Sequence, residues 1–129
     1  MCTRNASIDL PPIPPSIPVA RHVVRELLRA WDAPHDHEDA ALLVTELVAN
    51  VVDHVQGEAN LSLELAMADA WLRIAVVDGS AVRPVVQELT EHRPRGRGLQ
   101  MVRAIADRWG VEDHRGGKRV WFELAPPLG

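Results

Sequence analysis

The stretch ELVANVVDHV, residues 46–55, sets chemically active side chains among aliphatic ones. At 3.6 residues per turn, one side of a helix carries its polar members, which are Glu46, Asn50, Asp53 and His54. The other side is aliphatic and consists of Val44, Leu47, Val48, Val51 and Val55. A solvated helix face gives the same stripe, so the pattern alone does not identify a site. Exposed faces usually carry pairs of Lys, Arg and Glu, however, whereas Asn and His suit cation coordination and proton handling, which makes this stretch a candidate site.

Two further short stretches have the residue types of a ligand site. In VVDGS, Asp78 stands where an apolar strand breaks into a glycine turn, so its carboxylate can read a ligand's amino group. A turn acid that bonds its own backbone is the alternative. In GRGL, residues 96–99, glycines open a helix, where backbone N–H groups and the helix dipole favour an anion such as phosphate. Glycine before a helix is also common for conformational reasons alone.

Composition limits the classes of protein to consider. A chain of 129 residues with 47% hydrophobic content fits one domain, residues 1–129. The formal net charge of -4 lacks the broad positive field of nucleic-acid binders, so we expect no direct nucleic-acid partner. The lone cysteine, Cys2, can form no internal disulfide, and the first residues do not resemble a signal peptide. With no apolar run near the roughly 18 residues of a membrane span, we expect a soluble, cytoplasmic protein.

The first half of the chain predicts a strand and two helices. Residues 7–10 suit a short edge strand, and a proline-rich connector follows at 11–18. Ser16 can cap a helix whose apolar stripe is Val19, Val23, Leu27, Leu28 and Trp31. Asp36 resembles the N-cap of a second helix that runs to Val55 and contains the candidate stretch.

The second half predicts mainly strands. Alternating leucines at 61–65 and the run 71–77 form a hairpin that turns at Ala68 and Asp69. A segment of low periodicity, 79–95, precedes a third helix that runs from Gly96 to Asp107 or Arg108. Two strands, 110–113 and 119–124, follow around Gly116 and Gly117. This order predicts a two-layer α+β sandwich.

Smaller features have ordinary interpretations. The cluster His35, Asp36, His37 and Glu38 could suggest a metal site, but such residues at a helix start are mostly solvent-facing caps. The tryptophans at 31, 71, 109 and 121 each adjoin an apolar segment, which is typical of core or rim residues and not of a ligand cage.

Four stretches, ELVANVVDH, VVDGS, GRGLQMV and GGKRVWFEL, occur in the order and spacing of a known family. The chain resembles the GHKL ATP-binding superfamily from about Ile8 to Leu124, and more narrowly its single-domain anti-sigma-factor serine kinase branch. The resemblance implies the Bergerat fold, a two-layer α/β sandwich with a mixed, mostly antiparallel sheet. It also implies that ATP lies under a lid, here residues 80–95.

The resemblance assigns roles position by position. Glu46 matches the acid taken as general base, and Asn50 matches the amide that holds Mg²⁺ against the phosphates. Asp78 matches the aspartate that accepts a hydrogen bond from the adenine amino group, and Gly79 lets the base approach. Five further positions of this chain match family residues that lie near the phosphates of the nucleotide. They are His54, Gly96, Arg97, Gly98 and Leu99. Asp53 matches no family role, and we expect it to be exposed.

The implied function is an ATP- and Mg-dependent kinase that phosphorylates a serine or threonine of an anti-anti-sigma antagonist and otherwise sequesters a sigma factor. Relatives often dimerise, so a homodimer is a further expected state. The chain departs from the family at Ser80, Ala81 and Val82, where later glycines of the first box are missing, and at Arg119, where a threonine helps to bind adenine. A non-catalytic nucleotide-binding or protein-interaction module with a degenerate lid motif therefore stays open. A stand-alone ATPase or a histidine-kinase-like fragment is a third, less favoured alternative.

Overall fold

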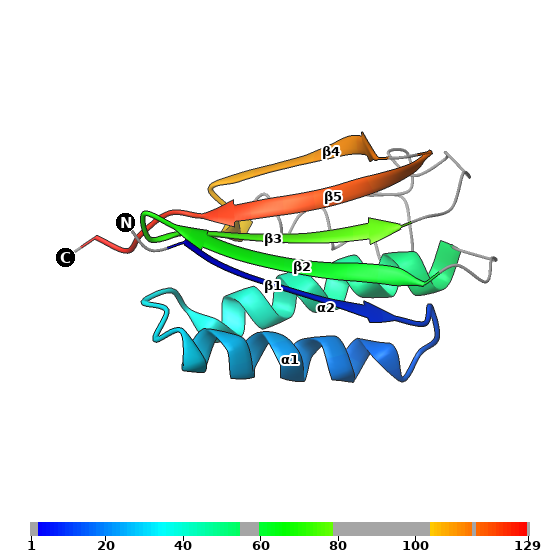
Figure 1. The fold of residues 1–129 in the computed structure, drawn as a ribbon, viewed down its shortest axis with the longest axis horizontal. Helices are drawn as coiled ribbons and strands as arrows, with labels where there is room; N and C mark the ends of the chain where they lie inside the picture. Colours follow the sequence, from blue (N-terminus) through cyan, green and yellow to red (C-terminus); the bar gives the residue numbers. More distant parts are fainter. Residues whose placement is uncertain (1–2, 55–59, 79–103, 115, 129) are drawn as a thin grey trace.

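The structure, a computed structural model, describes residues 3–54, 60–78, 104–114 and 116–128, which form a two-layer sandwich (Figure 1). The elements are β1 (Thr3–Leu10), α1 (Ser16–Ala30), α2 (His37–His54), β2 (Leu61–Ala68), β3 (Trp71–Asp78), β4 (Arg108–His114) and β5 (Gly117–Leu124). The strands form one sheet in the order β1-β2-β3-β5-β4, and α1 and α2 cover one of its faces. The predicted α+β sandwich is confirmed, and all four strand pairings in the described residues are antiparallel.

The core lies between the sheet and the two helices. Alternate residues of each central strand point inward, as the period of two in a strand requires. The inward residues of the sheet are Leu61, Leu63, Leu65, Leu72, Ile74, Val76, Val120, Phe122 and Leu124, all buried. The helices contribute Ala20, Val24 and Leu28 from α1 and Leu43, Val44, Leu47, Val48 and Val51 from α2. The predicted aliphatic side of α2 is confirmed for its described residues.

The helix α1 differs from its predicted form at the start. Pro15 is the N-cap and Ser16 is the first helical residue, and the Ser16 hydroxyl donates to the Pro11 carbonyl at 2.6 Å. Pro18 lies in the first turn, where a helix loses nothing through a missing N–H, so the connector ends at Pro15 and not at Pro18. Val19 is 44% exposed, so the predicted stripe is wrong there, and Ala20 and Val24 are buried in addition to the predicted Leu28. The other predicted members are partly buried against the core, and these are Val23, Leu27 and Trp31.

The helix α2 begins as predicted. Asp36 Oδ1 accepts hydrogen bonds from the backbone N–H groups of Glu38, at 2.9 Å, and Asp39, at 3.0 Å, which satisfies two donors that a helix start leaves open. Its described end is His54, and Val55 lies outside the described residues. Among the described residues, no helix combines the length and the apolarity needed to cross a membrane.

The strands are longer than predicted. Strands β2 and β3 form the expected hairpin, but the turn is made by Asp69 and Ala70, both with positive φ (53° and 65°), and Ala68 still belongs to β2. Strand β4 begins at Arg108, and Asp107 N–H donates to the Glu123 carbonyl at 2.9 Å. The predicted third helix therefore cannot extend to Asp107 or Arg108. Its start at Gly96 lies outside the described residues.

Candidate nucleotide site

The polar face of α2 holds the first two predicted site residues. Glu46 and Asn50 are half-buried and one helical turn apart, on the side of α2 away from the buried Leu47, Val48 and Val51. Asp53 is exposed, as expected. A carboxylate and an amide at this spacing present hard oxygen ligands and a proton acceptor to the same region of space. The half-burial of both side chains suits a site that is lined by protein and open to a ligand.

Asp78 ends β3 on the inner face of the sheet. It follows the inward residues Ile74 and Val76 at the strand's period of two, and it is only 2% exposed. Its carboxylate Oδ2 accepts a hydrogen bond from Lys118 Nζ at 3.1 Å, in an ion pair that is itself buried. The predicted position at the end of an apolar strand is confirmed. The carboxylate faces the layer between the sheet and the helices, and not the solvent.

Lys118 is a residue of the candidate site that the motifs did not identify. It lies directly opposite Asp78 in the register of β3 and β5 and is 5% exposed. The sequence does predict its position, because side chains alternate along a strand. Lys118 is an even number of residues from Val120, Phe122 and Leu124 and must share their inward face. A lysine on a buried face needs an acidic partner.

Arg119, expected at the adenine position, points the other way. Its Nε donates to Glu64 at 3.1 Å and its Nη1 donates to Glu112 at 3.0 Å, both on the outer face of the sheet. These contacts raise the pKa of Arg119, and the hydrogen bond to Glu112 is the largest cause. Arg119 therefore does not stand beside Asp78, and the residue that does is Lys118.

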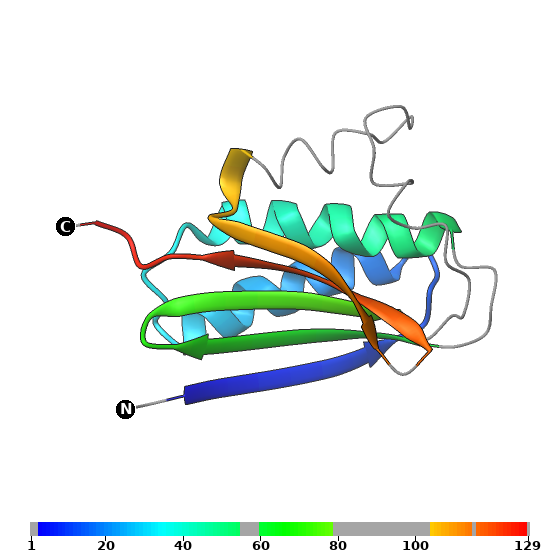
Figure 2. The ribbon, with the colours of Figure 1, turned by 90° about the horizontal axis from the view of Figure 1, so that it is seen from above.

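The elements that carry these residues meet at one end of the molecule. The C-terminal end of α2, the end of β3 and the start of β5 lie together in both views (Figures 1 and 2). The helix α2 also packs directly on β3. Glu46 and Asn50 on the helix layer and Asp78 and Lys118 on the sheet layer thus come from neighbouring segments. His54 ends α2 at this end of the molecule, while Gly79 and residues 80–95 and 96–99 lie outside the described residues.

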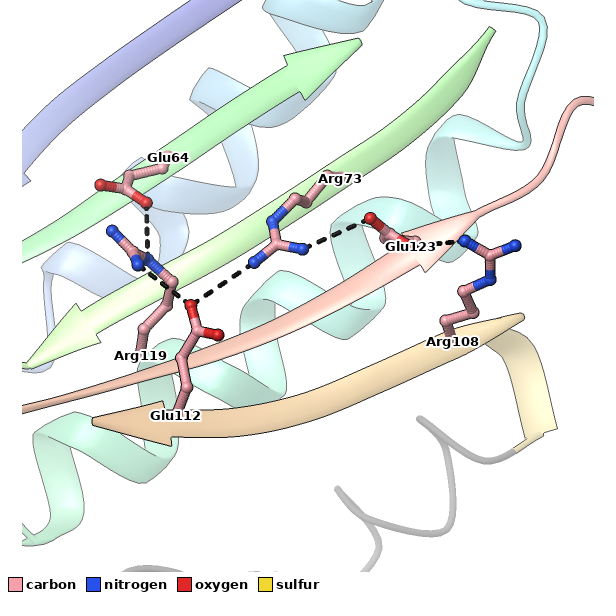
Figure 3. Close-up of polar contacts among 6 residues, drawn as sticks. All are labelled: Glu64, Arg73, Arg108, Glu112, Arg119 and Glu123. Carbon is pink, nitrogen blue, oxygen red and sulfur yellow. Dashed lines mark hydrogen bonds and ion pairs between the residues drawn. The ribbon is translucent and has the colours of Figure 1, made fainter. Parts of the chain in front are cut away.

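The outer face of the sheet carries a polar network of a different kind (Figure 3). Three arginines and three glutamates alternate along it, and they are Glu64, Arg119, Glu112, Arg73, Glu123 and Arg108. Two of the arginines also stack on tryptophans, with Arg73 Cζ 4.4 Å from the Trp121 ring centroid and Arg108 Cζ 4.2 Å from that of Trp71. The charges balance within the network. These tryptophans are half-buried, as predicted for rim residues.

A hollow of about 490 Å³ lies on this outer face. Its walls come from β1, β2 and β3 and include Asn5, Ser7, Glu64 and Arg73. It contains none of the predicted site residues. Because its floor is made of strand residues with short side chains such as Ala66 and Ala75, we interpret it as the curvature of an uncovered sheet.

The cluster at 35–38 consists of structural residues. Asp36 caps α2, Glu38 pairs with Arg25 at 2.6 Å, and His37 Nε2 lies 2.8 Å from the Ala33 carbonyl. His35 is 6% exposed, and neither ring nitrogen has a hydrogen-bond partner among the described residues. Burial lowers the pKa of His35, and the nearby backbone of Ala70 and Leu124 partly opposes the shift. Asp36, His37 and Glu38 therefore make three separate local contacts, and His35 is a buried side chain.

Comparison with known proteins identifies the family. Residues 10–124 match the family described as the histidine kinase-like ATPase domain. Since this match spans most of the chain, the protein belongs to that family, which confirms the superfamily resemblance seen in the motifs. ATP binding follows from membership in a family of ATPase domains. No curated protein matches the chain.

A solved structure supports the fold. The crystal structure of the RsbU and RsbW domains of Rv1364c from Mycobacterium tuberculosis superposes with a TM-score of 0.73 at 21% sequence identity. The likeness covers 95% of the present chain and 32% of that one, so the present chain spans about a third of the length of its relative. At 21% identity, this similarity is evidence for a shared fold alone.

Proposed function

We propose that this protein is an ATP-binding regulator of the anti-sigma-factor type. It transfers the γ-phosphate of ATP to a serine or threonine of an anti-anti-sigma antagonist, and in its other state it sequesters a sigma factor in the cytoplasm. The observation that carries the proposal is the pairing of Glu46 and Asn50, one turn apart and half-buried on α2, in a chain of the histidine kinase-like ATPase family. The narrower assignment, to the anti-sigma-factor kinase branch of this family, rests on the resemblance of the sequence motifs.

Glu46 is the proposed general base. A serine hydroxyl attacks the γ-phosphorus, the bond to the β,γ-bridging oxygen breaks, ADP leaves, and the hydroxyl proton passes to the Glu46 carboxylate. A carboxylate that is half-buried on a rigid helix is held in position for this step. Its neighbours on the inward side of α2 are packed in the core, which limits movement of the helix.

Asn50 is the proposed ligand-holding residue. Its amide offers one hard oxygen, and Mg²⁺ is commonly held by one or two protein oxygens together with substrate phosphates and water. The half-exposed amide on α2, beside a carboxylate one turn earlier, fits that donor set. When bound, Mg²⁺ would neutralise charge on the phosphates. His54 and the segment Gly96–Leu99 are proposed to lie near the phosphates, as the family resemblance implies.

Asp78 is the proposed base-reading residue, and Gly79 gives the base access to it. An ionised carboxylate at the end of β3 accepts a hydrogen bond from the amino group of adenine. The proposed lid, residues 80–95, follows directly in the chain.

A second candidate function is favoured by one observation. The Asp78 carboxylate is already engaged by Lys118, and a partner that holds this carboxylate can compete with adenine. A non-catalytic nucleotide-binding or interaction module, with sigma factor or antagonist as partner, would need no phosphoryl transfer. A homodimer is compatible with either function.

A phosphoryl-transfer assay tests the two functions. The protein is incubated with Mg²⁺, γ-labelled ATP and candidate antagonist proteins encoded near its gene, and phosphoserine or phosphothreonine is detected on the antagonist. We expect transfer by the wild type, loss of at least about a hundredfold in Glu46→Gln, as for removal of a general base, and retention in the matched control Asp53→Asn. ATP binding without transfer to any antagonist, and equal behaviour of Glu46→Gln, would favour the non-catalytic module.

A further inference from the structure

The strand β1 forms a free edge of the sheet. It stands at the end of the strand order and pairs with β2 along all eight of its residues, and no other described strand pairs with it. It runs along one margin of the molecule, and α1 lies nearer to it than α2 does in both views (Figures 1 and 2). Backbone N–H and C=O groups on the outer side of β1 are therefore placed to pair with a further strand.

The middle of this edge lacks the features that usually prevent strand pairing. Natural sheet edges are commonly blunted by charged side chains, proline or bulges. Residues 5–8 are Asn, Ala, Ser and Ile, with no charge and no proline, and their register with β2 is continuous. The opposite edge strand, β4, has four ionisable side chains among its seven residues, which are Arg108, Glu112, Asp113 and His114. Of these two strands, β1 is therefore the one suited to pair with another strand.

The side chains of β1 are complementary to those of a second β1. Directly opposite residues of an antiparallel pair point to the same face of the sheet. A two-fold axis through Ser7 therefore places Asn5 of each copy opposite Asp9 of the other on the outer face. On the inner face, Ala6 of each copy is opposite Ile8 of the other, and both of these side chains are half-buried in the single chain. Amide thus meets carboxylate, aliphatic meets aliphatic, and no like charges are opposed.

The flank of α1 on the same side of the molecule is apolar. Arg25 faces α2, where it pairs with Glu38. At about 100° per residue, the opposite flank of α1 carries Val19, Val23 and Leu27. Val19 is 44% exposed, and the other two are only partly buried. Pairing of two β1 strands makes the α1 flanks of both copies face each other across the axis, which removes apolar surface from water.

We propose that the partner of this edge is a second copy of the chain, and that the β1 strands of the two copies pair antiparallel about a two-fold axis at Ser7. The two five-stranded sheets thereby join into one continuous sheet. The polar face of α2, with Glu46 and Asn50, stays accessible in both copies, because α2 lies on the side of the helix layer away from β1 (Figures 1 and 2). The dimer requires no nucleotide, so this inference stands apart from the proposed function.

Disulfide cross-linking of the full chain, without nucleotide and under mild oxidation, tests the strand pairing. Cys2 is the single cysteine of the chain, so a Cys2→Ser background carries no thiol. In that background, Ser7→Cys places two thiols directly opposite each other, with Cα atoms about 4.5–5.5 Å apart, which a disulfide can bridge. Thr3→Cys is the matched control, because its two thiols lie roughly 26 Å apart along the paired strands. A covalent dimer is expected for Ser7→Cys and not for Thr3→Cys.

Analytical ultracentrifugation of the cysteine-unmodified chain tests the dimer and the α1 flank. The wild type is expected to sediment with twice the mass of one chain. Val19→Asp should raise the Kd of the dimer at least about tenfold, because it places two carboxylates in the apolar space between the α1 flanks. Leu42→Asp is the matched control, since Leu42 is 39% exposed on α2, and it should leave the Kd unchanged. Circular dichroism checks that each variant is folded.

Two results would overturn the proposal. The first is a wild type that stays monomeric at about 0.1 mM protein. The second is a dimer in which Ser7→Cys cross-links no better than Thr3→Cys, which would place the interface on another surface. Nucleotide binding, or its absence, bears on the proposed function alone, so failure of one proposal is distinguishable from failure of the other.

Discussion

The ring of Trp121 lies across Gly110, its direct partner in the β4–β5 register, and leaves no room for a side chain there. A Cβ atom on Gly110 would stand 2.8 Å from Trp121 Cζ2. The Arg73 guanidinium stacks on the same ring, so the ring is held in place by a further contact.

Gly110→Ala is therefore expected to lower the free energy of unfolding by about 1–3 kcal/mol, the usual cost of forcing an extra methyl group into a packed contact. Chemical denaturation followed by circular dichroism measures it. The loss should shrink in the double variant Gly110→Ala/Trp121→Leu, where the ring is gone. An equal loss in both backgrounds would show that the ring is not the cause.

The Asp78–Lys118 pair predicts a strongly non-additive stability effect. Lys118→Met leaves a buried carboxylate without its ammonium partner and should cost about 3–5 kcal/mol in unfolding free energy without nucleotide. The double variant Asp78→Asn/Lys118→Met removes both charges and should cost clearly less than the sum of the single changes. Additive losses would contradict the ion pair.

His35 predicts a dependence of stability on pH. Burial lowers the pKa of His35 in the folded protein below the unfolded value of 6.5, with neighbouring His37 adding to the shift and Asp107 opposing it. The unfolded chain therefore binds more protons in the window below pH 6.5. This contribution to stability is complete above pH 6.5 and is lost as the pH falls through the lowered folded pKa.

Denaturation of wild type and His35→Leu between pH 5 and 8 checks this sign. The slope of unfolding free energy against pH, below about pH 6.5, should be smaller in the variant. If the slope is the same in wild type and His35→Leu, groups other than His35 cause the pH dependence of stability.

Ala70 predicts a stabilising substitution. It adopts φ of 65° in the two-residue turn between β2 and β3, a conformation that costs an L-residue about 1–2 kcal/mol. Ala70→Gly should therefore raise the unfolding free energy, by less than that cost because glycine is more flexible when unfolded. The melting temperature is the simplest measurement, and a decrease would contradict the turn geometry.

The sequence was sufficient for those features that depend on local spacing. The Asp36 cap, the aliphatic and polar sides of α2 and the inward leucines of β2 follow from helix and strand periods. Pro18 was wrongly excluded from α1, because the first turn of a helix tolerates proline and its start depends on contacts such as Ser16 to Pro11.

The partners of charged side chains were not predictable in the same way. Asp78 and Lys118 are 40 positions apart, and only the β3–β5 register brings them together. The alternation of side chains along β5 places Lys118 on the inner face and Arg119 on the outer face. The motif comparison drew attention to Arg119, whereas the alternation shows that Lys118 is the neighbour of Asp78. The outer network likewise depends on the side-by-side placement of β2, β3, β5 and β4.

The central claim is that this chain holds a magnesium-bound nucleotide through α2 and the end of β3, and calorimetry with ATP tests it most directly. The wild type should bind ATP more tightly with Mg²⁺ than without it, and Asn50→Ala should remove most of that difference. Absence of binding at millimolar ATP, together with an unchanged titration of Asn50→Ala, would contradict the account.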